Sequence, residues 1–358
     1  MQNYLYNLAT DKYRGLIPNL VKLFLFILSL IYGLTVRILI FISYIKPCQL
    51  NCKVISIGNI TLGGTGKTSL VEFIARYLKR QGRKVAILSR GYKRKVTRYE
   101  SGVRSYEKMG DEAHMLQMNL KDIPVIVDVD RIRAAKRAIR NSDIDTVILD
   151  DGFQQWKIKK DLEIVTIDAT DPFGNQHLIP RGILREPLSS LKRAGMLVLT
   201  KTNLNPDIQD IKDFLSQINP KAPIFESIHL PLGFYRLGKS QELLKPQDLK
   251  GKTVTLISGI GDPDSFENLI ASIGINVGLA FRFPDHYNYS QKDLEKIFEA
   301  AQEKNIDMLI TTEKDAARLG SLQLIMLSSL QFLVLRIELK LIQNEEGFYR
   351  RLLGLYNS

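Results

Sequence analysis

A glycine-rich loop that ends in Gly-Lys-Thr is the most informative chemical feature of this sequence. The segment from Gly58 to Thr68 reads GNITLGGTGKT and directly follows the short apolar stretch 53–57. Residues 69–79 then place apolar side chains at helical spacing, which predicts a strand, a loop and a helix in succession. In such an arrangement the glycines let backbone N–H groups surround an oligophosphate, and the helix N-terminus adds partial positive charge. We therefore predict a phosphate-binding loop.

Individual residues of this loop have distinct expected roles. Lys67 would reach the β- and γ-phosphates of a nucleotide, and the hydroxyl of Thr68 would ligate Mg²⁺. The strict pattern has a glycine where Thr61 stands, so the loop could close differently from the usual form. The residues expected to bind the nucleotide, with ATP as the default, are Thr61, Leu62, Gly63, Gly64, Thr65, Gly66, Lys67 and Thr68.

A second apolar stretch ends in two carboxylates. Residues 146–149 read TVIL, and Asp150 and Asp151 follow them. Hard cations bind oxygen ligands, and an acidic residue at a strand end beside a phosphate-binding loop is the usual partner of Mg²⁺. We expect at least one of the two aspartates to hold the metal together with Thr68, and the sequence does not distinguish between them.

Strand-like and helical stretches alternate around these motifs. This alternation predicts a mostly parallel sheet covered on both faces, the fold class of P-loop nucleotide-binding proteins. Ligands of such folds bind at the carboxyl ends of the strands, where the loop and Asp150 both fall. The expected strands are 84–88, 124–127, 162–167 and 196–200, and the expected helices are 130–140 and 208–218.

Composition narrows the class of protein. The 358 residues are 45% hydrophobic and 25% charged, which excludes a disordered chain. Two cysteines are too few for a disulfide-rich secreted protein of this length. The net charge of +12 favours polyanionic partners. Because no nucleic-acid-binding motif is present, we expect an anionic membrane surface and phosphate groups rather than nucleic acid.

The N-terminal region is strongly apolar. Residues 23–36 carry no charge, and this stretch is shorter than the roughly 20 residues that a membrane-spanning helix needs. We therefore expect a helix that lies in the membrane interface, with its cations directed toward anionic headgroups. A buried core helix and a single membrane span remain alternatives. The polar residues that share one stripe of this helix are Lys22, Ser29, Gly33 and Arg37.

Further charged segments suggest where an acceptor would bind. The basic segment SRGYKRK at 89–95 and a separate arginine could hold phosphate groups of the acceptor or the nucleotide. Asp111 and Glu112 open a helical stretch, and His286 lies in the later segment FPDHYNY. The cations expected to bind substrate are Arg90, Lys93, Arg94 and Arg185.

The order of these motifs resembles a known family. The segments ISIGNITLGGTGKTSLV, LSRGYKRK, GDEA, VILDDGFQ, IPRGILREPLSSLKRA, SGIGDP, FPDHYNYS and TTEKDA occur in the order found in tetraacyldisaccharide 4'-kinase, the lipid A 4'-kinase of Gram-negative bacteria. The likeness runs from the N-terminal apolar helix to about Leu319, and the tail beyond is matched only in general character.

The resemblance implies a membrane-associated P-loop kinase that uses ATP and Mg²⁺. Its reaction moves the γ-phosphate of ATP to the 4'-hydroxyl of a tetraacylated disaccharide 1-phosphate, on the cytoplasmic face of the inner membrane of a Gram-negative bacterium, with peripheral or monotopic attachment. By resemblance, Asp111 accepts the hydroxyl proton and His286 pairs with it, while Lys67 helps to neutralise the developing charge. Glu112 is a further candidate metal ligand. Asp111 could instead only complement a helix dipole, and His286 could be a hydrogen-bonded loop residue.

We expect residues 1–50 to form the N-terminal membrane-associated helix, 51–227 the P-loop kinase domain, and 228–358 a smaller C-terminal α/β lobe. This division places Asp111 and His286 in different lobes, and predicts that the pair assembles only when the lobes close. The alternative function is a membrane-associated P-loop ATPase or switch that has no small-molecule acceptor.

Overall fold

The chain forms two compact units in the computed structural model, which describes residues 15–91, 109–239, 242–319 and 330–357, together with Leu8, Asp11 and Tyr13. Unit 1 is drawn from residues 1–88, 130–228 and 341–358. Unit 2 is drawn from residues 89–129 and 229–340.

The division between units differs from the expected one in two segments. The boundary near residue 228 is where the sequence placed it, but residues 89–129 fold with the second unit and residues 341–358 return to the first. The chain leaves unit 1 after residue 88, returns at residue 130, leaves again after residue 228 and returns at residue 341. Local periodicity predicts elements but not such returns, because a return depends on contacts between residues far apart in the sequence.

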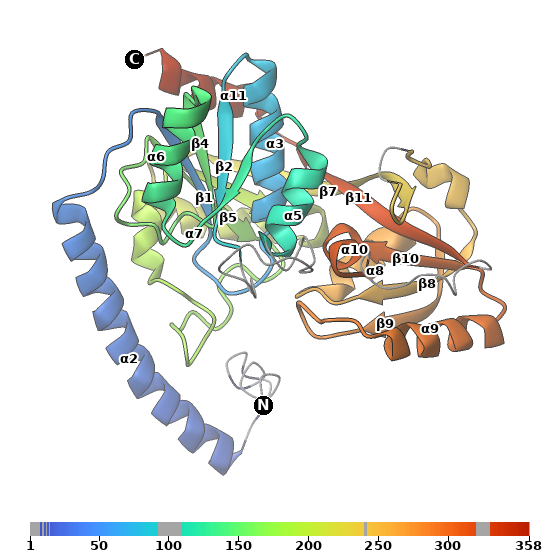
Figure 1. The fold of residues 1–358 in the computed structure, drawn as a ribbon. Coiled ribbons are helices and arrows are strands. Elements are labelled where there is room, and N and C mark those ends of the chain that lie inside the picture. The colour runs from blue at the N-terminus through green and yellow to red at the C-terminus, as the bar shows by residue number, and fades with distance from the viewer. Residues whose placement is uncertain are drawn as a thin grey trace. The chain divides into compact units, whose positions relative to one another are not determined.

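Unit 1 is built on a sheet in which each recorded strand pair is parallel (Figure 1). Every residue of β2, β4 and β6 is buried, as expected for strands that are covered on both faces. The predicted parallel α/β fold is therefore confirmed. The strands follow one another in the order β2 (Val85–Ser89), β4 (Thr146–Asp150), β1 (Lys53–Gly58), β5 (Leu162–Asp168), β6 (Met196–Thr200) and β7 (Ile224–Arg236).

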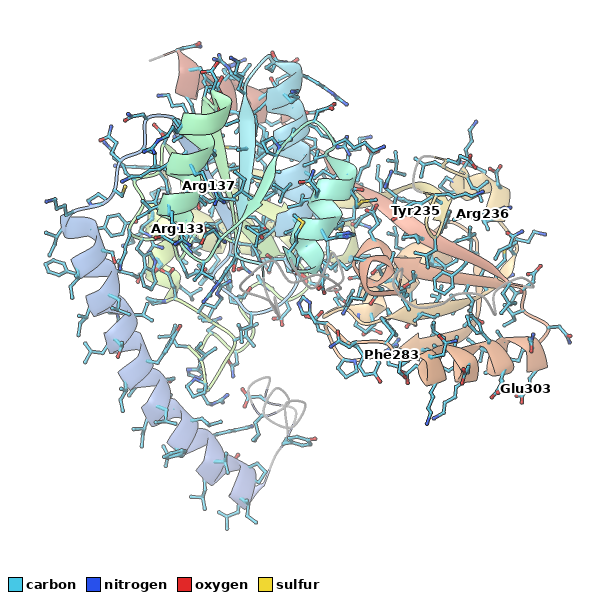
Figure 2. The ribbon with its side chains drawn as sticks, in the orientation of Figure 1. Arg133, Arg137, Tyr235, Arg236, Phe283 and Glu303 are labelled. Carbon is cyan, nitrogen blue, oxygen red and sulfur yellow. The ribbon has the colours of Figure 1, made fainter. Side chains whose placement is uncertain are left out.

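The helices of unit 1 are amphipathic. Helix α3 (Lys67–Arg80) packs against β1 and β4 through a buried apolar face. Helix α6 (Arg131–Ser142) begins at the cap Asp130, whose side chain accepts a hydrogen bond from the backbone N–H of Arg133. Its outer face carries exposed cations, and Figure 2 labels Arg133 and Arg137 among them. Helix α7 (Ile208–Ile218) connects β6 with β7.

The N-terminal helix α2 (Leu16–Ile45) has 30 residues, which corresponds to about 45 Å at the usual rise per residue. The helix is longer than the uncharged stretch 23–36 from which its length was predicted. By length and composition it could cross a membrane. Only 22% of its most apolar window is buried, which is inconsistent with a buried core helix. An interfacial helix and a membrane span both remain compatible with this exposure.

The middle of the polar stripe of α2 lies against the protein, whereas Arg37 is exposed. Ser29 and Gly33 are buried, and a Cβ added to Gly33 would lie 2.6 Å from a methyl carbon of Leu178. Lys22 forms an ion pair of 2.7 Å with Asp11. The expectation that this stripe directs its cations toward headgroups is therefore wrong for Lys22. Small residues allow close packing on this side, while large apolar side chains cover most of the remaining surface.

Unit 2 is a smaller α/β unit, as expected. Its recorded strand pairs, β10 with β11, β10 with β8, and β8 with β9, are parallel. The strands follow the second half of β7 in the order β11 (Gln331–Leu341), β10 (Met308–Thr312), β8 (Thr253–Ser258) and β9 (Asn276–Arg282).

Alternate residues of the central strands serve two apolar clusters in unit 2. Val254 of β8 packs in one cluster with helix α8 (Pro263–Ser272), and Ile257 packs in the other with helix α9 (Gln291–Glu303). Successive side chains of a strand point to opposite faces, so the sheet is covered on both sides. Unit 2 also contains β3 (Val125–Val127), the 3-10 helix η3 (Pro246–Leu249), α5 (Asp111–Asn119) and α10 (Glu313–Leu319). Helix α5 packs against α10.

Helix α11 (Glu345–Leu353) completes unit 1. The ring of Phe348 is fully buried, with its centroid 6.1 Å from that of Phe73 on α3 and 5.1 Å from that of Phe225 on β7. The C-terminal segment thus packs against the helix that follows the phosphate-binding loop.

Replacing Phe348 with Ala is expected to lower the free energy of unfolding by about 3–5 kcal/mol, because a buried aromatic ring is lost and a cavity remains. Urea denaturation followed by circular dichroism measures this change. Glu346→Ala, at an exposed position of the same helix, should change stability by less than about 0.5 kcal/mol. Equal stability of the Phe348 variant and the parent protein would contradict the packing described.

Candidate active site

The predicted phosphate-binding loop lies in unit 1 between β1 and α3. Gly63 and Gly66 have φ angles of 109° and 75°, a region that side chains rarely adopt. A Cβ built on Gly63 or Gly64 would meet no atom within 4 Å, so the loop is open at this point. Lys67 opens the helix directly after Gly66. The loop therefore has the backbone freedom and helix N-terminus that phosphate binding requires.

Thr61 stands in place of the usual first glycine and needs no left-handed backbone. It is buried and forms an antiparallel bridge with Leu184. The next residue, Leu62, donates its backbone N–H to the carbonyl oxygen of Ile183 at 2.8 Å. The side-chain amide of Asn59 donates to the hydroxyl of Thr61 at 3.4 Å. With Thr61 in place of the glycine, the start of the loop thus packs against residues 183–184.

The far side of the loop is fixed to neighbouring strands. The hydroxyl oxygens of Thr65 and Thr166 on β5 lie 2.7 Å apart. The hydroxyl of Thr200 on β6 donates to the carbonyl oxygen of Thr65 at 3.2 Å. These buried contacts hold the residue before Gly66 in one place, so the loop is anchored at both of its ends.

The two predicted acidic residues lie next to the loop. The register of the sheet pairs Ile57 of β1 with Asp150 of β4, so the carboxyl ends of both strands meet. The carboxylate of Asp151 accepts two hydrogen bonds from the guanidinium of Arg185, at 2.8 and 3.0 Å. It also lies 3.8 Å from the ammonium of Lys67. Burial alone would raise the pKa of Asp151, but Lys67 and Arg185 outweigh it and hold this pKa below its ordinary value.

Arg185 connects several parts of the site. Besides Asp151, its guanidinium donates to the side-chain oxygen of Asn59 at 3.1 Å. Its backbone carbonyl accepts a hydrogen bond of 2.9 Å from the hydroxyl of Tyr32 on α2. The amide of Gln154 donates to the carbonyl of Asn59 at 3.0 Å. Arg185, expected to bind substrate, is thus already engaged in ordering the loop and Asp151.

The available oxygen ligands suit a metal ion that is shared with a nucleotide. No group of three or more His, Cys, Asp or Glu side chains that could hold a metal occurs among the residues that the structure describes. Mg²⁺ beside phosphates usually takes one or two protein ligands and completes its shell with phosphate oxygens and water. The hydroxyl of Thr68 on α3 and the carboxylates of Asp150 and Asp151 are a donor set of this kind.

A second group of predicted residues meets in unit 2. Nδ1 of His286 lies 2.7 Å from Oδ2 of Asp111, and both side chains are largely buried. His286 has a left-handed φ of 59°, and its backbone N–H donates to the carbonyl oxygen of Gly259 at 3.1 Å. The hypothesis that lobe closure assembles this pair is wrong, because residues 89–129 belong to the same unit as His286.

Glu112, the neighbour of Asp111, is held by a cation. Its carboxylate lies 3.1 Å from the ammonium of Lys314 and 3.8 Å from Nε2 of His286. Burial would raise the pKa of Glu112, but Lys314 and His286 lower it from 4.5 to about 2. Burial would likewise lower the pKa of Lys314, but Glu112 raises it. Metal binding by Glu112 would have to compete with this ion pair, and remains a prediction.

Three aromatic rings surround the loop that carries His286. The ring centroid of Phe283, labelled in Figure 2, lies 4.7 Å from that of Tyr287 and 5.1 Å from that of Tyr289. The two tyrosine rings are 5.4 Å apart. This cluster packs on both sides of His286 in the sequence and supports its unusual backbone conformation.

Among the residues that the structure describes, no contact joins the remaining predicted cations to Asp111, Glu112 or His286. Arg90 is exposed immediately after β2. Lys93 and Arg94 lie outside the residues that the structure describes. The sequence did not predict the groups that hold these residues: Asn59 and Tyr32 contact Arg185, while Lys314 and Arg318 pair with Glu112 and Asp111.

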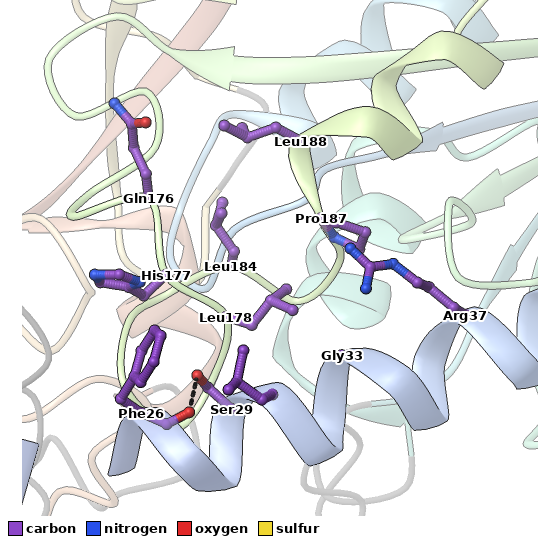
Figure 3. Close-up of a pocket in the computed structure, with 11 residues that line it drawn as sticks. Phe26, Ser29, Gly33, Arg37, Gln176, His177, Leu178, Leu184, Pro187 and Leu188 are labelled. Atoms are coloured by element: carbon purple, nitrogen blue, oxygen red, sulfur yellow. Dashed lines mark hydrogen bonds between the residues drawn. The ribbon is translucent and has the colours of Figure 1, made fainter. Parts of the chain in front are cut away.

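A cavity of about 240 Å³ lies in unit 1 between α2 and residues 176–188 (Figure 3). Most of its wall is apolar, and the hydroxyl of Ser29 donates to the carbonyl of Phe26 on its own helix at 2.7 Å. The ring of Phe26 meets that of His177 edge-on, at a centroid distance of 5.6 Å. Arg37 also lines the cavity, beside Pro187 and Leu188.

Comparison with known proteins identifies the family. The profile of the family described as tetraacyldisaccharide-1-P 4'-kinase matches residues 21–357. The chain belongs to this family. It is similar to the tetraacyldisaccharide 4'-kinase of Halothermothrix orenii, with 38% identity over 339 residues, which cover 89% of this chain and 88% of that relative. The tetraacyldisaccharide 4'-kinase of Syntrophobacter fumaroxidans is 39% identical over 284 residues, 77% of this chain and 74% of the relative.

A solved structure agrees with this assignment to the tetraacyldisaccharide 4'-kinase family. The fold is similar to that of LpxK from Aquifex aeolicus, described as an "apo" form in complex with ATP, with a TM-score of 0.74 and 29% identity. The similarity covers 94% of this chain and 99% of that chain. The family resemblance predicted from the motifs is confirmed, and it continues past Leu319 to residue 357. The alternative of a P-loop ATPase or switch without an acceptor is not favoured.

The ion pair of Glu112 in this family member predicts a pH dependence of stability. The folded protein keeps Glu112 charged until pH falls to about 2, whereas its ordinary pKa is 4.5. The unfolded chain therefore binds more protons between these values, and stability is lost as pH falls through that window. Glu112→Gln should flatten the fall in melting temperature between about pH 4.5 and pH 2, measured by calorimetry in EDTA.

A matched control for this measurement is Glu303→Gln, which removes one negative charge at an exposed position of α9 in the same unit (Figure 2). That variant should keep the slope of the parent protein. An unchanged slope in the Glu112 variant would show that the ion pair with Lys314 does not stabilise unit 2.

Proposed function

We propose that this member of the tetraacyldisaccharide 4'-kinase family transfers the γ-phosphate of ATP to the 4'-hydroxyl of a tetraacyldisaccharide 1-phosphate, a step of lipid A synthesis. The observation that carries the proposal is the meeting of the glycine-rich loop and Asp150 at the carboxyl ends of β1 and β4, in a chain with this family membership. A triphosphate bound by the loop would lie beside both Lys67 and the acidic pair.

Charge neutralisation is the main contribution expected from unit 1. Phosphoryl transfer has a loose transition state with charge spread over the γ-phosphate oxygens, so positioning and electrostatics dominate the rate. Lys67 would bind the β- and γ-phosphates, and the loop N–H groups would surround them. Thr68 with Asp150 or Asp151 would hold Mg²⁺, which when bound neutralises phosphate charge and orients the leaving diphosphate.

Proton removal is the contribution proposed for Asp111 and His286. As the 4'-hydroxyl oxygen bonds to the γ-phosphorus and the bond to the β–γ bridging oxygen breaks, the hydroxyl proton passes to the carboxylate of Asp111, and ADP leaves. The 2.7 Å contact with His286 supports this role, because an imidazole at that distance orients the carboxylate and shares its proton. Glu112 is kept as a candidate ligand on the metal side.

The acceptor is an amphiphile, which accounts for the exposed apolar surface of α2. We propose that α2 associates with the cytoplasmic face of the inner membrane of a Gram-negative bacterium, by a peripheral or monotopic attachment. The cavity beneath α2 is smaller than the roughly 300–1,000 Å³ of typical small-molecule sites, so it suits part of one acyl chain rather than the disaccharide. Arg90, Lys93 and Arg94 are proposed to bind phosphate groups.

The proposed reaction is tested with purified protein, γ-labelled ATP, Mg²⁺ and the disaccharide 1-phosphate in detergent. Label should appear in the glycolipid in proportion to the ATP consumed. Lys67→Ala should lower kcat/KM by about 10²-fold or more, because the cation that binds the β- and γ-phosphates is lost. ATP hydrolysis without labelled glycolipid would contradict the proposed acceptor.

Replacing His286 with Ala should reduce kcat by about 10²-fold, the size expected of general acid–base help, with a much smaller change in the KM for ATP. Asp111→Asn should have a comparable effect, because it removes the proposed proton acceptor. Steady-state kinetics with the labelled-ATP assay measures both variants. Near-normal turnover of either would remove its residue from the proposed chemistry.

A further inference from the structure

Helix α10 supplies cations to two consecutive carboxylates in unit 2. The ammonium of Lys314 lies 3.1 Å from Glu112, and Nε of Arg318 lies 3.5 Å from Oδ2 of Asp111. The two cations are four residues apart, so they share one face of the helix and project one turn from each other. The two cations of this short helix thus face the two carboxylates at the start of α5.

Arg318 is almost completely buried and is held in one orientation. Its side chain is 2% exposed. Nη2 donates to a carboxylate oxygen of Asp315 at 2.7 Å and to the carbonyl of Gly259 at 3.1 Å, and Nη1 donates to the carbonyl of Tyr287 at 3.3 Å. The guanidinium therefore touches Asp111 together with backbone groups around His286.

Asp315, which accepts a hydrogen bond from Arg318, is itself held by several donors. Its fully buried carboxylate accepts hydrogen bonds from the backbone N–H of Gly259 at 3.0 Å, the hydroxyl of Tyr289 at 2.7 Å and the hydroxyl of Thr312 at 2.7 Å. Gly259 in turn accepts the backbone N–H of His286. The hydrogen bonds of a buried carboxylate are charge-assisted, and with this many donors its position is fixed.

The contacts of Asp111 are uneven between its two oxygens. Within the described part of the chain, the recorded contacts of this carboxylate with His286 and with Arg318 both involve Oδ2. This geometry leaves Oδ1 as the oxygen that can take a proton from an acceptor hydroxyl without breaking either contact.

We propose that Arg318, held by Asp315, is a positioning residue for the phosphoryl transfer: together with His286 it engages Oδ2 of Asp111 and thereby leaves Oδ1 for the acceptor hydroxyl. The inference rests on the proposed role of Asp111 as proton acceptor. Arginine suits this task because its planar fork reaches Asp111, Asp315 and two carbonyl groups at once, which a lysine cannot do.

The central experiment compares Arg318→Lys in the parent protein and in the His286→Ala background, with the labelled-ATP assay. In the parent, kcat should fall about 10-fold or more while the KM for ATP stays within about twofold. In the His286→Ala background the same change should lower kcat by less than about threefold. The effects of two substitutions do not add when both residues act on the same group, here the carboxylate of Asp111.

Arg336→Lys is the matched control. Arg336 also pairs with α10, through Glu313 at 2.9 Å, and is mostly buried. It donates a hydrogen bond of 3.0 Å to Asn119, at the end of α5 opposite to Asp111. This variant should keep kcat within about threefold of the parent. A loss as large as that of Arg318→Lys would mean that α10 merely needs its ion pairs for folding, and would overturn the inference.

Tyr289→Phe keeps the test decisive where Arg318→Lys unfolds below the assay temperature. It deletes one hydrogen bond to Asp315 and retains the ring, so kcat should fall severalfold with an unchanged KM for ATP. Equal fold-losses in both backgrounds, or a rise in KM with unchanged kcat, would overturn the positioning role. A parent protein that labels no glycolipid would instead refute the proposed function itself.

Discussion

Compensation of negative charge that is removed from water, almost fully at Asp111 and partly at Asp151, is the constraint on which both groups of site residues depend. Removing a carboxylate from water is costly unless a cation and hydrogen bonds accompany it. Asp151 is held by Arg185 and Lys67 in unit 1, and Asp111 has Arg318 and His286 as partners in unit 2. In each case the partners come from segments distant in the sequence, so the folded chain, rather than any local motif, fixes where the carboxylates stand.

The pairing of Asp111 with its partners depends on how the chain is divided. The stretch 89–129 leaves unit 1 and joins residues 229–340, and it brings the acidic start of α5 against α10. As a result, the proposed proton acceptor and its imidazole partner belong to one unit, while the glycine-rich loop belongs to the other. The groups proposed for phosphate binding and for proton transfer thus come from different units.

Much of the fold could be predicted from the sequence, because buried parallel strands and amphipathic helices have strong local patterns. The loop before Lys67, the acidic end of β4 and most strands of unit 1 were predicted on this basis. Strand β7 (Ile224–Arg236) was missed, since Pro231 and Gly233 interrupt its pattern. The ion pairs of Arg185 with Asp151 and of Arg318 with Asp111 could not be predicted, because nothing in a local pattern specifies a partner more than thirty residues away.

The return of α11 to unit 1 has a consequence for the order of events during synthesis. Chains generally begin to fold from the N-terminal side as they leave the ribosome. Here Phe348, whose ring packs against that of Phe73, is translated about 275 residues after it. The helix behind the glycine-rich loop therefore stays partly uncovered until α11 has emerged. Nucleotide binding is therefore expected to develop late, after α11 has been translated and has packed against α3.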